Sequence, residues 1–110
     1  MTEFKMSIMG VMYKVQVGTR AELGMSDSDQ GSTRFYSHEI QICNEAEGFT
    51  PSELKRVVRE TMIHELAHAY LYECGHVRLA DDEEVEEWLS VVFDHIVSSV
   101  EEFDKKVNKS

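Results

Sequence analysis

The sequence predicts an α+β fold in which a small, mostly antiparallel sheet packs on two main helices. Before residue 50, apolar and polar residues alternate with the period of a half-buried strand. After the only proline, Pro51, apolar residues recur at helical spacing. A chain of 110 residues suits one domain, and we expect residues 1–110 to form it, with about three strands.

The strand signals lie in the first half of the chain. Residues 11–17 alternate apolar and polar side chains and predict a strand, and residues 9–10 mark a turn or bulge before it. Residues 18–31 are polar and turn-rich, as in a loop. Residues 35–43 resemble a hairpin whose second strand would be Glu39–Cys43. If that strand lies at an edge of the sheet, it could pair with an extended peptide.

A helix start signal opens the second half. Thr50 can cap the free N–H groups of a helix, Pro51 suits the first helical position, and Glu53 completes a capping box. We expect this helix to run to about Cys74, because Gly75 can take the left-handed conformation of a helix end.

A second helix is predicted from about Asp82 to Lys105. Acidic residues at 81–84 open it and lysines at 105–106 close it, which suits the helix dipole. Its apolar face should pack on the first helix. That face includes Leu89, Phe93, Ile96 and Val100.

The composition excludes some functions. With 11 Lys+Arg against 21 Asp+Glu, the formal net charge is -10, and such a surface repels nucleic acid phosphates and anionic lipids. We therefore expect neither direct nucleic acid binding nor membrane association. The sequence does not begin with basic residues followed by a long apolar stretch, which is the pattern of a secretory leader. The expected location is therefore the cytoplasm. Cys43 and Cys74 are expected to be buried thiols rather than a disulfide or metal ligands.

The strongest chemical signal is the HExxH pattern His64-Glu65-Leu66-Ala67-His68, in the middle of the first helix. Residues four apart share a helix face, so the two imidazoles can grip one zinc ion. Glu65 is the expected general base, which takes a proton from a water molecule that zinc has acidified. The pattern predicts a zinc metallopeptidase that binds one Zn²⁺ and acts on a protein or peptide. The alternative is a pair of satisfied core histidines.

A catalytic zinc site usually has three protein ligands. The apolar face of the last helix, followed back by one turn, reaches Glu86, which makes Glu86 the first choice for the third ligand. Glu87 ranks second and Glu83 third. His76 and Glu73, at the end of the first helix, are further candidates.

Three residues outside the motif are weaker candidates. Tyr70 and Tyr72 could assist an oxyanion, although core packing suits them better. His38 could border the cleft, with a plain turn histidine as the alternative.

The two segments Thr61-Met62-Ile63-His64-Glu65-Leu66-Ala67-His68-Ala69 and Glu83-Glu84-Val85-Glu86 resemble the small ImmA/IrrE-type metallopeptidases of phages and mobile elements. The resemblance covers roughly residues 50–100 and implies a minimal zincin-like domain. It further implies that His64, His68 and Glu86 bind zinc and that Glu65 is the base. Better-known members of the family cleave repressor proteins.

Three other functions are compatible with the sequence. The first is a zinc-containing phage regulatory or binding protein without turnover. The second is a phage regulator whose acidic surface imitates nucleic acid. The third is a SprT-like peptidase, a family whose third zinc ligand is histidine.

Overall fold

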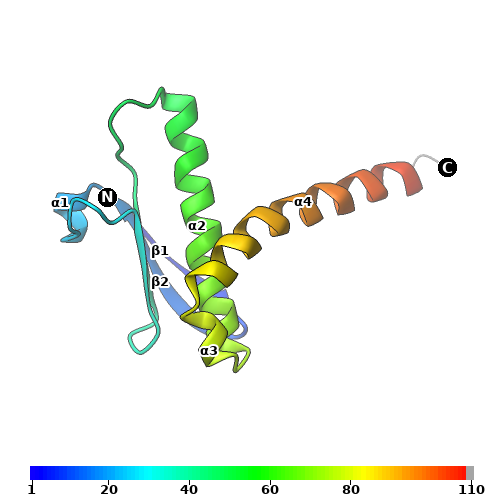
Figure 1. The fold of residues 1–110 in the computed structure, drawn as a ribbon, viewed down its shortest axis with the longest axis horizontal. Helices are drawn as coiled ribbons and strands as arrows, with labels where there is room; N and C mark the ends of the chain where they lie inside the picture. The colour runs from blue at the N-terminus through cyan, green and yellow to red at the C-terminus, as the bar shows by residue number, and fades with distance from the viewer. Residues whose placement is uncertain (109–110) are drawn as a thin grey trace.

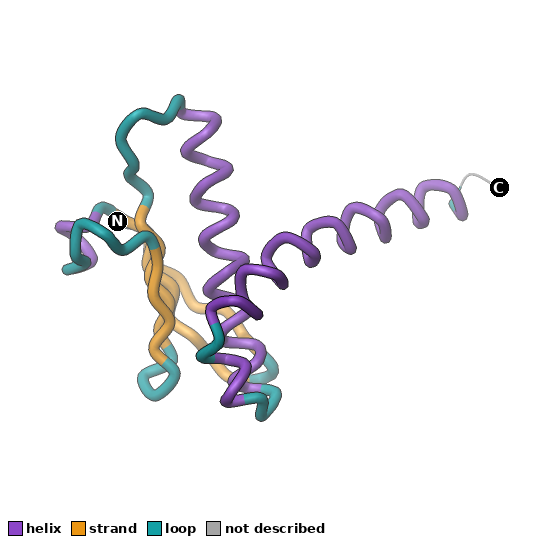
Figure 2. The backbone as a smooth tube through the Cα atoms, viewed as in Figure 1, coloured by secondary structure: helices purple, strands orange, loops and turns teal. Residues whose placement is uncertain are grey.

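The structure, a computed structural model, describes residues 1–108 and confirms the α+β class (Figure 1). Helix α2 lies on one face of the sheet, and α4 crosses α2 and leaves the body of the protein (Figure 2). The strands are β1 (Thr2–Ile8), β2 (Val11–Gly18), β3 (Gly31–Arg34) and β4 (Glu39–Cys43). The helices are α1 (Arg20–Leu23), α2 (Pro51–Glu73), α3 (Val77–Ala80) and α4 (Glu83–Val107).

The sheet has four strands, one more than expected, in the order β1-β2-β4-β3, and two of its three strand pairs are antiparallel, as expected for a mostly antiparallel sheet. The pairs β1–β2 and β3–β4 are antiparallel, whereas β2 and β4 run parallel. After β2 the chain crosses to the far edge of the sheet and forms β3 there. It then returns as β4 between β2 and β3. Local alternation predicts a strand but not this long-range pairing, so the sequence did not predict the parallel pair of β2 and β4.

The hypothesis that Glu39–Cys43 is an edge strand is wrong. As β4 it is an inner strand, and Ile40, Ile42 and Cys43 are buried. Its hairpin partner is residues 31–34, because residues 35–38 form the turn. The edge strand on this side of the sheet is therefore β3.

The core lies between the sheet and α2. Its buried members are Ile8, Tyr13, Val15, Ile40, Ile42 and Ala69, with Val58, Met62 and Leu66 of α2 packed against them. Burial of this set follows from the alternation in β2 and β4 and the apolar face of α2. Cys43 is buried as expected, but Cys74 is exposed at the end of α2.

The predicted start of α2 is confirmed in detail. The Thr50 hydroxyl accepts a hydrogen bond from the N–H of Glu53, and the Glu53 carboxylate accepts one from the N–H of Thr50. The hydrogen bond from the Thr50 N–H to the carboxylate lowers the pKa of Glu53. The helix ends at Glu73, followed by Gly75 with φ 87, the left-handed conformation expected there.

Helix α4 begins after Asp82, whose carboxylate accepts hydrogen bonds from the N–H groups of Glu84 and Val85. Arg59 of α2 donates to Asp94 of α4 at 2.7 Å. Because α4 projects, the radius of gyration is 15.5 Å. A compact chain of this length would have about 13 Å. Every helix among residues 1–108 is too short or too polar to span a bilayer.

Candidate metal centre

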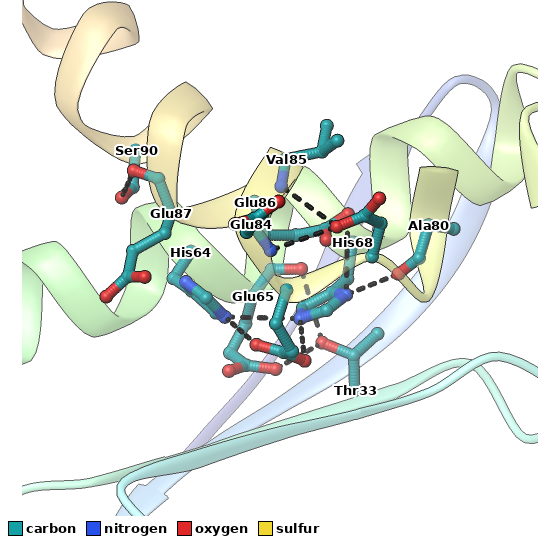
Figure 3. Close-up of polar contacts among 12 residues, drawn as sticks. Thr33, His64, Glu65, His68, Ala80, Glu84, Val85, Glu86, Glu87 and Ser90 are labelled. Atoms are coloured by element: carbon teal, nitrogen blue, oxygen red, sulfur yellow. Dashed lines mark hydrogen bonds and ion pairs between the residues drawn. The ribbon is translucent and has the colours of Figure 1, made fainter. Parts of the chain in front are cut away.

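Two histidines of α2 face each other one helical turn apart. The ring centroids of His64 and His68 are 4.9 Å apart, and their Nε2 atoms are 3.2 Å apart. His68 is buried, while His64 is partly open to solvent. The predicted convergence of the two imidazoles is therefore present (Figure 3).

Glu83, the first residue of α4, lies at the same point. Its Oε2 is 3.0 Å from Nε2 of His64, and its Oε1 is 3.3 Å from Nε2 of His68. Ligand atoms held about 2.0–2.1 Å from a tetrahedral zinc ion are about 3.3 Å apart. The two nitrogens thus have the spacing of two corners of a zinc tetrahedron, and each has a different oxygen of the Glu83 carboxylate at a similar distance.

A backbone hydrogen bond at Nδ1 fixes the tautomer of His68. The carbonyl oxygen of Ala80, at the end of α3, accepts a hydrogen bond from Nδ1 of His68. In the neutral ring Nδ1 then carries the proton, and Nε2 presents its lone pair to His64 and Glu83. One proton can bridge only one pair among these three groups, whereas a cation between them would satisfy all three. The residues present fit a divalent metal ion.

Glu86 occupies a different place from the one expected of a ligand. Its side chain is 0% exposed, and its Oε1 is 3.6 Å from Nδ1 of His68, the ring nitrogen that faces away from Glu83. Both carboxylate oxygens lack a hydrogen-bond partner among the described residues. Burial raises the pKa of Glu86. The structure thus brings Glu83 to the Nε2 atoms, because the first turn of α4 starts beside them. The side of α4 that faces the core, which carries Glu86, lies instead next to Nδ1 of His68.

Replacement of Glu86 by methionine should stabilise the metal-free protein. A buried polar group without a hydrogen-bond partner costs about 1–3 kcal/mol, and methionine keeps a similar volume without that cost. We expect Glu86→Met to raise the free energy of unfolding by about this amount in urea denaturation. Glu87→Met, on the exposed neighbour, is the matched control and should have little effect. A destabilised Glu86→Met variant would mean that the carboxyl group has a stabilising partner.

Glu65 is held beside the histidines by the edge strand. Only 6% of it is exposed, and the Thr33 hydroxyl of β3 donates to its Oε1 at 2.7 Å (Figure 3). Burial raises the pKa of Glu65, and the hydrogen bond from Thr33 opposes part of that rise. A carboxylate whose pKa is raised is a stronger base near neutral pH. This position and environment suit the predicted general base.

A close approach of β3 to α2 makes the Thr33 contact possible. At Gly31 a Cβ atom would lie 2.8 Å from Cγ2 of Thr61 and 3.0 Å from Cγ of Glu65. The Thr61 hydroxyl donates to the Val57 carbonyl at 2.8 Å, which fixes the orientation of that methyl group. Glycine at position 31 therefore lets β3 carry Thr33 to Glu65.

Gly31→Ala should separate the edge strand from α2. We expect the variant to lose about 1–3 kcal/mol of stability, the usual range for overpacking, and to weaken the Thr33–Glu65 hydrogen bond. Thermal unfolding measures the first effect, and hydrogen exchange of the β3 amides measures the second. Ser32→Ala is the control for a change at the neighbouring position of β3 that adds no Cβ atom, and because the buried Ser32 hydroxyl has no hydrogen-bond partner among residues 1–108, this variant should not lose stability. Equal stability of Gly31→Ala and the parent would contradict the close approach.

The cluster opens into a cleft of about 620 Å³ between β3 and the two long helices. Among the described residues, its lining contains no lysine or arginine. Its carboxylates come from Asp29, Glu60, Glu65, Asp81, Glu83 and Glu87. Such a lining attracts cations.

Other candidates from the sequence lie away from the histidine pair. The Tyr13 hydroxyl donates to Glu73 at 2.9 Å, which holds that carboxylate at the sheet. The ring of Tyr72 stacks on Phe35 with centroids 4.4 Å apart. His38, in the turn between β3 and β4, has its ring centroid 5.1 Å from that of Tyr13.

The remaining candidates are at the surface. Glu87 lines the cleft but is not part of the three-residue cluster. His76 is exposed and directly precedes α3, and Tyr70 is exposed on α2. None of the three contributes a ligand atom to the cluster formed among residues 1–108.

Three contributors to the site were not anticipated. Gly31 and Thr33 belong to a segment without a motif, and Ala80 contributes only its backbone carbonyl. A backbone contribution leaves no signal in residue identity. For Gly31 and Thr33, the available signal was a short strand with a glycine at its start, which often marks a close approach.

Comparison with protein-family models, with curated proteins and with solved structures gave no match.

Proposed function

We propose that this chain is a zinc-dependent endopeptidase that acts on a protein substrate. The observation that carries the proposal is the convergence of His64, His68 and Glu83 beside the buried Glu65 in one open cleft. Two imidazoles and a carboxylate form a common ligand set of catalytic zinc sites, which keep a further position for water or substrate.

Each of these residues has a distinct role in the proposal. His64, His68 and Glu83 would hold the ion. When bound, zinc supplies a Lewis acid that acidifies a water molecule and polarises a peptide carbonyl. Glu65 would accept the proton of the attacking water and deliver it to the leaving amine. Thr33 keeps the Glu65 carboxylate in one orientation, since its hydroxyl holds Oε1.

The substrate proposed is an extended peptide segment. Strand β3 borders the cleft and, within residues 1–108, pairs with β4 on one side only, so its other edge is available for strand addition. Thr33 lies on this strand, and the added peptide would therefore pass beside Glu65. The carboxylates of the cleft favour lysine or arginine next to the bond that is cleaved.

The setting proposed follows from the resemblance to ImmA/IrrE-type enzymes. By that resemblance the substrate would be a repressor or another regulator encoded by a phage or mobile element. Cys43 and Cys74 are free thiols, which fits the reducing cytoplasm.

Cleavage of a peptide library by the zinc-loaded chain, followed by mass spectrometry, tests the proposal. We expect cleavage near basic residues, loss of cleavage when a chelator removes zinc, and recovery when one equivalent of zinc is returned. His64→Ala should lose both zinc and cleavage, whereas His95→Ala, on α4 outside the cluster, should keep both. Stoichiometric zinc without cleavage of any peptide would refute the peptidase and leave a zinc-containing binding or regulatory protein.

A further inference from the structure

The outer half of α4 presents an apolar stripe to solvent where the helix leaves the body (Figure 1). Phe93, Ile96, Val100 and Phe103 are each more than half exposed. Leu89 of the same face is closer to α2 and only partly exposed. A contiguous exposed stripe of large apolar side chains is typical of an interaction surface.

The spacing of this stripe indicates the kind of partner. Its four members follow one another at steps of three, four and three residues. This is the a/d spacing of a coiled-coil seam, in which the apolar residues of one helix meet those of a second helix. The partner surface should therefore be another helix with a matching seam.

We propose that two copies of this chain associate through the α4 stripe, with the two helices antiparallel. About a two-fold axis near Ser98, Ile96 meets Val100 and Phe93 meets Phe103 of the second copy. These layers use every member of the stripe, so the surface is complementary to itself. An isologous contact of this kind closes at a dimer.

The charges of α4 favour the antiparallel orientation. The helix opens with Glu83, Glu84 and Glu86, and its last turn carries Lys105 and Lys106. Antiparallel packing opposes the helix dipoles and keeps the acidic first turns at opposite ends of the dimer. Parallel packing would instead place two acidic starts side by side in a chain with formal net charge -10.

The dimer should be weak and concentration-dependent. Side chains of this size, about half exposed, can each bury roughly 100 Å², or about 400 Å² for the four. Flanking residues add to this area, but the total stays below the about 800 Å² per partner of a standard interface. Association is therefore expected at high micromolar rather than nanomolar concentrations.

Sedimentation velocity over a range of concentrations tests the association. We expect the full chain to shift from monomer toward dimer, and Ile96→Glu to remain monomeric throughout. Val91→Glu is the matched control, since it adds the same charge at an exposed position on the opposite side of α4. A monomer at every concentration, a larger oligomer, or equal loss of dimer in both variants would overturn the proposal.

Disulfide formation between single cysteines tests the orientation. In a Cys74→Ser background, Ser99→Cys leaves the apolar stripe intact and places two thiols together beside the antiparallel axis. Its neighbour Ser98→Cys faces outward and serves as the control. We expect rapid oxidation to a covalent dimer only for Ser99→Cys. Equal rates for the two variants, or no covalent dimer from Ser99→Cys, would overturn the antiparallel register. Both experiments use metal-free or zinc-loaded chain and are independent of peptidase activity.

Discussion

Glu83→Gln is expected to weaken zinc binding by more than about a hundredfold. The Glu83 oxygens lie 3.0 Å and 3.3 Å from the Nε2 atoms of His64 and His68, so the variant removes a negatively charged ligand. Loss of a residue that only orients a metal ligand typically lowers metal affinity about 10–100-fold. Loss of the ligand itself should lower it by more. Competition with a chromophoric chelator measures the change. Since the Glu83 side chain is 73% exposed, the fold should tolerate the substitution.

Two matched variants separate Glu83 from its neighbours. Glu84→Gln removes a carboxylate from the same first turn of α4 and should bind zinc like the parent. Glu86→Gln should weaken binding much less than Glu83→Gln, because Glu86 lies 3.6 Å from Nδ1 of His68, on the side of the ring away from the cluster, and makes no hydrogen bond to it. If Glu86→Gln lost zinc and Glu83→Gln kept it, Glu86 would be the third ligand, as the sequence predicted.

The residues on α2 could be predicted because local rules determine them. The capping box fixes where the helix begins, and a spacing of four residues then places His64 and His68 on one face whatever the rest of the chain does. Glu65 follows from the same spacing, and its burial follows from the apolar surroundings of the motif.

The identity of the glutamate beside the histidine pair could not be derived from local rules in the same way. Helical periodicity correctly identified Glu86 as the carboxylate that faces the core, where it is fully buried. Which glutamate reaches the imidazoles depends instead on where α4 starts, and the short helix α3 decides that. Its last residue, Ala80, contacts His68 directly, so the first turn of α4 begins beside the histidine pair. Long-range placement, rather than periodicity, selects Glu83.

In the sheet, too, local patterns predicted individual strands but not their arrangement. Alternation identified the strand at residues 11–17 and the strand Glu39–Cys43. The order of strands depends on pairings between distant residues, such as Val15 with Ile40, which the local pattern does not encode. The edge strand was therefore misassigned, and the strand that carries Thr33 was not anticipated.

Glu65→Gln is expected to lower kcat/KM for a cleaved peptide by about 10²–10⁴-fold, because an amide cannot accept the proton of the attacking water. Zinc affinity should stay near that of the parent, since Glu65 is not part of the three-residue cluster. Glu60→Gln, on the same helix and lining the same cleft, is the control and should keep most of the activity. Peptide hydrolysis and zinc titration on the same samples distinguish loss of the base from loss of the metal.

Thr33→Val extends this prediction to the edge strand. The substitution removes the hydroxyl that donates to Oε1 of Glu65 at 2.7 Å, while valine keeps the shape and the strand preference of threonine. We expect kcat to fall less than in Glu65→Gln, with KM and zinc affinity little changed, because the base remains but loses its fixed orientation. If Glu65→Gln cleaved peptides as fast as the parent, proton transfer would have to involve another group. If Glu65→Gln lowers kcat but Thr33→Val does not, β3 only borders the cleft and does not support catalysis.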